Sequence, residues 1–169
     1  MSSNRFTICF ILALLVQLVL AKYCQWPFVY ICILPAMILC MPTIRPTWWT
    51  MAVAFLAGFA VDALADGPLG LNAVALVPVA ALQKTIIRFA IDADIVDRHY
   101  NLSFRSNGYI RLSIALALAY AVFFIIYIIV DSAGVRNFGF NLTKLLSSTL
   151  VSLIFGMTTI AVLCPYQRK

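Results

Sequence analysis

Residues 58–72 read GFAVDALADGPLGLN and separate two apolar runs that are each long enough to cross a membrane. Gly58, Asp62 and Asp66 follow one another at four-residue spacing, which places them on one face of a helix. Both carboxylates come at the end of the first run, where the helix dipole disfavours negative charge. Asp62 lies about one turn inside that end, at a depth where an unpaired carboxylate is costly. It is interpreted either as a polar anchor that bonds the following helix or a partner, or as an interfacial residue that reaches the headgroups.

The residues that follow Asp66 predict a tight turn. Gly67 is suited to ending one helix, and Pro68 is suited to the first turn of the next. Leu69 and Gly70 then lead into the second apolar run. Because the turn is too short for the helices to separate, the stretch predicts an antiparallel helical hairpin.

The composition places the whole chain in a membrane. Of its 169 residues, 64% are hydrophobic and 11% are charged, whereas a soluble domain carries roughly a quarter charged residues. The length allows about six spans of roughly 20 residues each. The sequence therefore predicts an all-α, polytopic membrane helix bundle of one domain over 1–169, with spans at about 6–21, 28–44, 48–65, 68–90, 109–130 and 142–163.

The first two predicted spans each carry a local complication. The run 6–21 ends in Ala21 and could be a cleaved signal peptide, but a thin charged region before it and the membrane-embedded sequence after it favour a retained span. The run 28–44 contains Pro35. A proline within a helix removes one hydrogen bond, so a kinked helix is expected there.

The basic residues are distributed unevenly between the two sides that six spans would create. With the N-terminus in the cytoplasm, nine lie on the cytoplasmic side, where Lys and Arg accumulate, and three lie opposite. The cytoplasmic set is Arg5, Arg45, Lys84, Arg88, Arg98, Arg105, Arg111, Arg168 and Lys169, and the opposite set is Lys22, Arg136 and Lys144. Both termini are therefore predicted to be cytoplasmic. Because these residues are scattered between apolar runs, the net charge of +6 does not indicate nucleic acid.

The remaining polar residues predict no catalytic, metal or cofactor site. The connection 91–108 holds three aspartates and the one histidine, His99, and is expected to be a solvated loop. Asp131, at the end of a span, is also expected to be solvated. The five cysteines contain no CxxC pair and are expected to be small apolar filler. They are Cys9, Cys24, Cys32, Cys40 and Cys164.

A helix with the pattern G-x-x-x-D, followed by a Gly-Pro-Leu-Gly turn that opens the next helix, resembles the rod shape-determining protein MreD family. Here the pattern is formed by Gly58, Asp62, Gly67, Pro68, Leu69 and Gly70, with Asp66 directly before the turn. The resemblance implies a fold similar to the substrate-binding membrane component of energy-coupling-factor transporters. It also implies a non-catalytic role in the inner membrane. That role is to bind MreC and to support peptidoglycan synthesis, indirectly with RodA, a penicillin-binding transpeptidase and MreB.

Two other functions are open to a protein of this composition. A binding subunit for a small solute of the vitamin type would need a polar pocket, and the polar residues of the spans show no clear convergence in the sequence. They are Gln17, Asn72, Gln83, Ser113, Thr149 and Ser152. An intramembrane enzyme is disfavoured, because the chain has no glutamate, and two aspartates four apart on one helix are not a facing dyad.

Overall fold

A computed structural model describes residues 3–23, 29–43, 45–65, 69–90, 109–132 and 138–163. Within these ranges the regular structure is helical, with no β-strand. The helices are α1 (Ser3–Tyr23), α2 (Leu34–Leu39), α3 (Thr47–Leu64), α4 (Leu71–Ala90), α7 (Tyr109–Ser132) and α8 (Phe138–Leu163). The predicted all-α class is confirmed.

Four of the helices are long and apolar enough to cross a bilayer. These stretches are Thr47–Leu64, Leu71–Ala90, Ile110–Ser132 and Gly139–Ala161, and α1 adds a shorter apolar stretch at Thr7–Tyr23. Most of their outward side chains are apolar, and on α8 such side chains recur every four residues at Leu142, Leu146, Leu150 and Ile154. Such a surface is soluble in hydrocarbon and not in water, so the chain is a multi-pass membrane protein.

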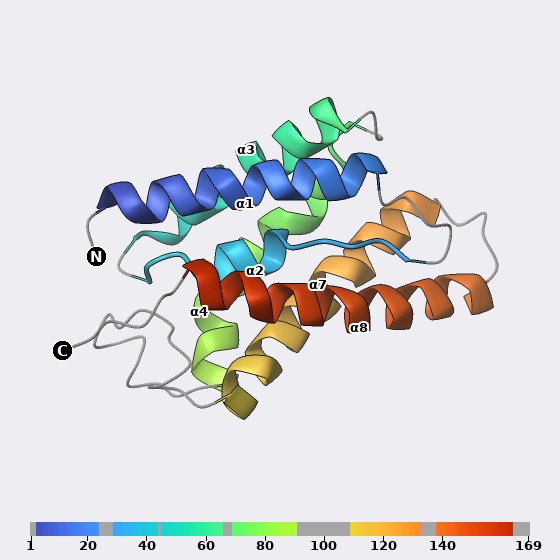
Figure 1. Cartoon of the computed structure of the whole chain (residues 1–169). Helices are drawn as coiled ribbons and strands as arrows, with labels where there is room; N and C mark the ends of the chain where they lie inside the picture. Colours follow the sequence, from blue (N-terminus) through green and yellow to red (C-terminus); the bar gives the residue numbers. More distant parts are fainter. Residues whose placement is uncertain are drawn as a thin grey trace.

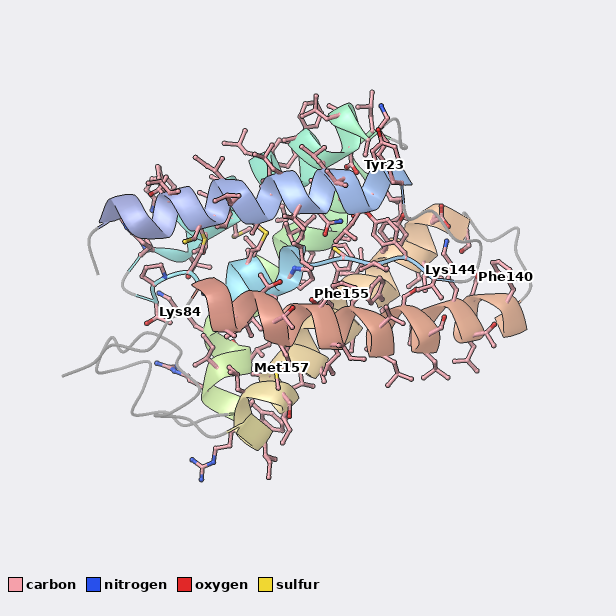
Figure 2. All side chains as sticks on the ribbon, in the orientation of Figure 1. Tyr23, Lys84, Phe140, Lys144, Phe155 and Met157 are labelled. Atoms are coloured by element: carbon pink, nitrogen blue, oxygen red, sulfur yellow. The ribbon has the colours of Figure 1, made fainter. Side chains whose placement is uncertain are left out.

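The helices alternate in direction, so their termini gather at two ends of the bundle (Figure 1). One end, called here the Asp62 end, holds the helix termini Tyr23, Leu64, Leu71, Ser132 and Phe138. The other, the Arg88 end, holds Ser3, Thr47, Ala90, Tyr109 and Leu163. Figure 2 shows Lys84 on the opposite side of the bundle from Tyr23 and Lys144.

The structure differs most from the prediction at the second span. Instead of a continuous helix over 28–44, residues 29–33 carry no helix and α2 has only 6 residues. Six helical residues rise about 9 Å, which is far less than the ~30 Å of a hydrocarbon core. Pro35 lies in the first turn of α2, where its missing N–H costs no helical bond. It therefore begins a helix and does not kink one.

The short helix α2 forms the centre of the core. All six of its residues are buried, and α1, α3, α4, α7 and α8 surround it (Figure 1). Non-helical backbone is tolerated at membrane depth only where protein covers it. Residues 29–33 can therefore be non-helical because the surrounding helices cover them.

Candidate functional site

Asp62 binds the first turn of α4. Its Oδ2 accepts hydrogen bonds from the backbone N–H groups of Asn72 at 2.9 Å and Ala73 at 3.4 Å. Its Oδ1 accepts one from the Asn72 side-chain amide at 2.7 Å. The first N–H groups of a helix have no partner within the helix, and a carboxylate is favoured there by the dipole. Asp62 is thus a cap supplied by the preceding helix, and at 3% exposure it does not reach the headgroups.

Gly58 lets α3 approach α4 at the same place. A Cβ atom on Gly58 would lie 2.6 Å from both the Cα and the backbone N of Ala73. Such contacts are with backbone, which cannot move aside as a side chain can. Close approach by a small residue is a common basis of helix packing in membranes. Gly58 and Asp62, one turn apart, therefore fix the two helices of the hairpin against each other.

The turn between these helices is described only in part. Gly70 has φ +88°, a left-handed conformation that favours glycine, and Leu69 beside it is 72% exposed. Asp66, Gly67 and Pro68 lie outside the described residues. The structure describes four of the predicted site residues. Gly58 and Asp62 pack inside the bundle, whereas Leu69 and Gly70 form the described part of the turn.

Tyr30 connects this hairpin to the rest of the bundle. Its hydroxyl donates to Asn72 Oδ1 at 3.1 Å and lies 2.9 Å from Asn72 Nδ2. Its ring stacks on Tyr127 of α7, with centroids 4.7 Å apart, and meets Phe124 edge-on. Its backbone N–H donates to Ser148 Oγ of α8 at 2.9 Å. One residue of the non-helical segment thus contacts α4, α7 and α8.

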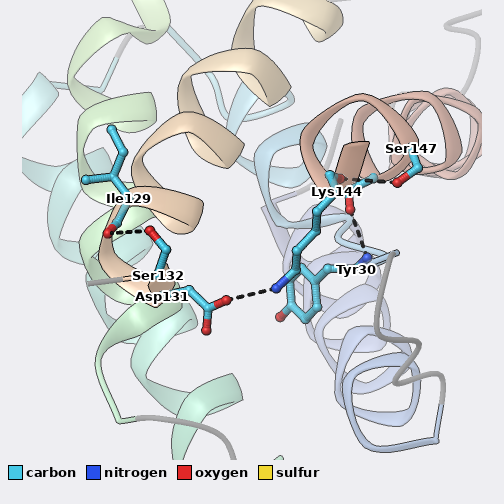
Figure 3. Close-up of polar contacts among 7 residues, drawn as sticks. Tyr30, Ile129, Asp131, Ser132, Lys144 and Ser147 are labelled. Carbon is cyan, nitrogen blue, oxygen red and sulfur yellow. Dashed lines mark hydrogen bonds and ion pairs between the residues drawn. The ribbon is translucent and has the colours of Figure 1, made fainter. Parts of the chain in front are cut away.

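A second charged group lies near Tyr127. The Lys144 amine extends from α8 to the Asp131 carboxylate at the end of α7, at 2.8 Å (Figure 3). The same amine lies 5.7 Å from the Tyr127 ring centroid. The two side chains are 12% and 19% exposed, so the expectation that Asp131 is solvated is wrong. At the Asp62 end, hydrogen bonds therefore connect Asp62, Asn72 and Tyr30, and ring contacts of Tyr127 connect Tyr30 to the Lys144 amine.

Side chains from other helices satisfy the backbone of the non-helical segment on both of its edges. On one edge, the Ser152 hydroxyl accepts from the Cys32 N–H at 3.0 Å and donates to the Tyr30 carbonyl at 3.3 Å. On the other edge, the Gln17 amide accepts from the Ile33 N–H at 2.7 Å and donates to the Ile31 carbonyl at 3.3 Å. The Gln17 amide thus takes the place of a peptide group in a parallel β pairing.

The arrangement of Ser148 and Ser152 has a simple geometric reason. Backbone N–H groups on one edge of an extended chain recur every two residues, which is about 6.6 Å. Helix residues four apart rise about 6 Å along the same face. Ser148 and Ser152 are four apart and buried, so their hydroxyls match the N–H groups of Tyr30 and Cys32.

Gln83 of α4 completes the support of this region. Its amide nitrogen donates to the carbonyls of Ile38 at 2.9 Å and Met41 at 3.0 Å, which lie at the end of α2. Three polar residues of the predicted spans therefore do converge, but on the protein's own backbone. They are Gln17, Gln83 and Ser152. The Asn72 side chain bonds the side chains of Tyr30 and Asp62. Ser113 and Thr149 instead donate to carbonyls of their own helices.

The described residues contain no group of three side chains that could hold a metal ion. Cys32 and Cys40 are buried and unbridged in the core, and Cys9 is half-buried. Cys24, Cys164 and the connection 91–108 with His99 lie outside the described residues. Two buried side-chain oxygens of the described part have no hydrogen-bond partner, those of Thr43 and Tyr120.

Comparison with known proteins gives no relative. No family model, curated protein or solved structure matches the chain.

Proposed function

We propose that the chain is a non-catalytic component of the bacterial cell-shape machinery that binds an MreC-like partner and supports peptidoglycan synthesis. RodA, a penicillin-binding transpeptidase and MreB would be indirect partners. The support is the pattern at 58–72, which resembles MreD, together with the geometry of its residues. Gly58 and Asp62 hold the two helices of the hairpin in a fixed arrangement, and a protein that binds a partner needs such a fixed surface.

The observation that carries the proposal is the contact of Asp62 with the first turn of α4. A carboxylate buried in a membrane helix marks a functional site by default. Here it bonds two backbone N–H groups and one amide of the same chain. Asp62 therefore sets the geometry of the hairpin. Both of its carboxylate oxygens bond to the same chain, so neither is directed at a substrate.

The alternative, a binding subunit for a vitamin-type solute, has less support. It needs polar side chains that are available to a ligand. The amides of Gln17 and Gln83 and the hydroxyl of Ser152 are bonded to the backbone of 30–41. The hydroxyls of Thr43 and Tyr120 are the two buried side-chain oxygens of the described residues without a hydrogen-bond partner, and two neutral hydroxyls are too few polar groups for a solute site.

We place the protein in the bacterial inner membrane with both termini in the cytoplasm. The basic residues favour this orientation. In the described part, Arg45, Arg88 and Arg111 are close in sequence to the helix termini of the Arg88 end, and Lys22 is next to the terminus of α1 at the Asp62 end. Lys84 lies on the opposite side of the bundle from Lys144 (Figure 2). The Asp62 end would then face away from the cytoplasm.

The test combines depletion with capture. Depletion of the protein should convert rod-shaped cells into rounded ones, and a tagged copy should capture the MreC-like protein. Asp62→Ala should reduce both rescue of cell shape and capture, whereas Ala63→Ser, at the adjacent exposed position, should reduce neither. Unchanged cell shape, with no MreC-like protein in the captured material, would contradict the proposal.

A further inference from the structure

Five backbone groups of residues 30–33 form hydrogen bonds with side chains of other helices. Ser148 and Ser152 of α8 bond three of these groups, and Gln17 of α1 bonds the other two. A helix over the same residues would bond such groups to its own backbone instead. Both arrangements satisfy a backbone that lies inside a membrane protein. The segment therefore has two possible conformations, and the extended one depends on α1 and α8.

The sequence around this segment is compatible with a continuous helix. The apolar run 28–44 reaches the lower limit of about 17 residues for a membrane span. Ile33, directly before α2, has φ −105° and ψ −5°, which is already in the right-handed helical region. An extension of α2 toward its N-terminus would also provide partners for its first N–H groups, which have none within α2. The obstacle to such an extension is Pro35.

Gln17 is placed to compensate for the hydrogen bond that Pro35 removes from a continuous helix. Proline has no N–H, so the carbonyl four residues earlier, that of Ile31, would have no donor in the helix. The Gln17 side-chain amide donates to this same carbonyl in the structure, at 3.3 Å. This hydrogen bond can therefore be made in both conformations.

The hydrogen bonds to α8 belong to the extended conformation alone. In a continuous helix, the Tyr30 carbonyl would accept from the Leu34 N–H, and the Cys32 N–H would donate to the carbonyl four residues before it. In the structure, Ser152 bonds both of these groups, at 3.3 Å and 3.0 Å. Ser148 bonds the Tyr30 N–H at 2.9 Å. Because contacts made in one state alone favour that state, the two serines favour the extended conformation.

We propose that residues 29–33 are a conformational switch, which is extended while α8 is in place and helical, continuous with α2, when α8 moves away. An extended chain rises about 3.3 Å per residue and a helix about 1.5 Å, so the conversion shortens the segment by about 9 Å. Tyr30 then leaves Asn72 and Tyr127, which it contacts in the extended state. The position of α8 is thereby transmitted to the hairpin of α3 and α4. The switch does not depend on the proposed function.

Solid-state NMR of the full-length protein in lipid bilayers tests the switch. With ¹³C-labelled cysteine, the Cα chemical shift of Cys32 reports whether its backbone is extended or helical, and Cys32→Ser assigns the signal. The wild type should give the shift of an extended residue, and Ser148→Ala combined with Ser152→Ala should move it to the helical value. The control is Thr143→Ala combined with Thr149→Ala, which removes two hydroxyls that bond their own helix. It should leave the Cys32 signal unchanged.

Pro35→Ala is a second test, which decides the question if the serine variant does not fold. It removes none of the side-chain bonds, and its new N–H would bond the Ile31 carbonyl in a continuous helix. The Cys32 signal should therefore move toward the helical value in this variant too. A Cys32 signal that stays extended in every folded variant, or that becomes helical in the control, would overturn the inference.

The transmission to the hairpin needs its own readout. A photoreactive residue in place of Tyr30 should form adducts with α4 when the serines of α8 are present. The adducts should be lost when Ser148→Ala and Ser152→Ala are combined in the same chain. Conversion of Cys32 to the helical value with an unchanged yield of adducts on α4 would contradict the transmission.

Discussion

Asp62 Oδ1 lies 2.7 Å from Asn72 Nδ2, and Asp62 Oδ2 lies 2.9 Å from the Asn72 backbone nitrogen, so one carboxylate binds both donors of one residue. Asn72 in turn bonds the Tyr30 hydroxyl. The charge of Asp62 is thereby offset at the start of α4, and the side chain of Asn72 is oriented toward the centre of the bundle. The hairpin and the non-helical segment are therefore connected through Asn72.

Asp62→Ala should destabilise the protein by about 1–3 kcal/mol, the usual cost of leaving buried donors without a partner. Asp62→Asn should cost less, because its carbonyl oxygen still accepts one of the bonds. Thermal unfolding in detergent micelles measures both, with Ala63→Ser as the control. Equal stability of Asp62→Ala and the wild type would show that the cap contributes nothing.

Gly58→Ala should also destabilise, since the added Cβ would lie 2.6 Å from the backbone of Ala73 and must push α3 away from α4. Overpacking of this kind costs about 1–3 kcal/mol. The matched control is Gly139→Ala in α8, where nothing lies within 4 Å of the new Cβ. That variant should be as stable as the wild type or slightly more so. A larger loss at Gly139 than at Gly58 would contradict the packing described here.

The hairpin was the part of the fold that the sequence predicted best. Gly58 and Asp62 are one turn apart and precede a glycine-proline turn, and these are local features that a single sequence displays. The second span could not be predicted in the same way. A short apolar run has no periodicity that distinguishes a helix from a buried extended segment, and Pro35 is compatible with either the start or the middle of a helix.

The hydrogen bonds between distant segments could not be predicted from the sequence, for a different reason. Tyr30 bonds Ser148, which is 118 residues away, and Cys32 bonds Ser152, which is 120 residues away. Such pairs depend on how the helices pack, and no pattern in one sequence specifies that. The ion pair of Asp131 and Lys144 is closer, at 13 residues. This ion pair could have been predicted from the sequence, because opposite charges lie at similar depths of two consecutive antiparallel spans.

Gln17→Ala should weaken the attachment of α1. The substitution leaves the Ile33 N–H and the Ile31 carbonyl without partners in a site that water does not reach, at a cost of about 1–3 kcal/mol. Gln17→Glu should be intermediate at best, because it keeps the acceptor and loses the donor. Protease sensitivity of α1 in micelles is a direct measurement, with the half-exposed Val16→Ala as the control. Equal sensitivity of all three variants would mean that Gln17 does not hold α1.

The first span should remain attached in the mature protein. The peptide bond after Ala21 lies inside α1, and Ala21 is 6% exposed. A signal peptidase would have to unwind and expose this turn. Mass spectrometry of the protein purified from membranes should therefore find α1 in the same polypeptide as α8. A product that begins at Lys22 would contradict this prediction.

The ion pair between Lys144 and Asp131 should show a favourable coupling energy in a double-mutant cycle. Lys144→Met and Asp131→Asn each remove one side of the ion pair, and together they remove both charges. The double variant should therefore be more stable than the sum of the single effects predicts, by about 0.5–3 kcal/mol. Lys84→Met paired with Asp131→Asn is the control cycle, because Lys84 lies at the opposite end of the bundle.

The single variants also separate two roles of Lys144. Its amine lies over the Tyr127 ring, so Lys144→Met should cost more than Asp131→Asn if the contact with Tyr127 contributes independently. Equal costs would assign the whole effect to the ion pair.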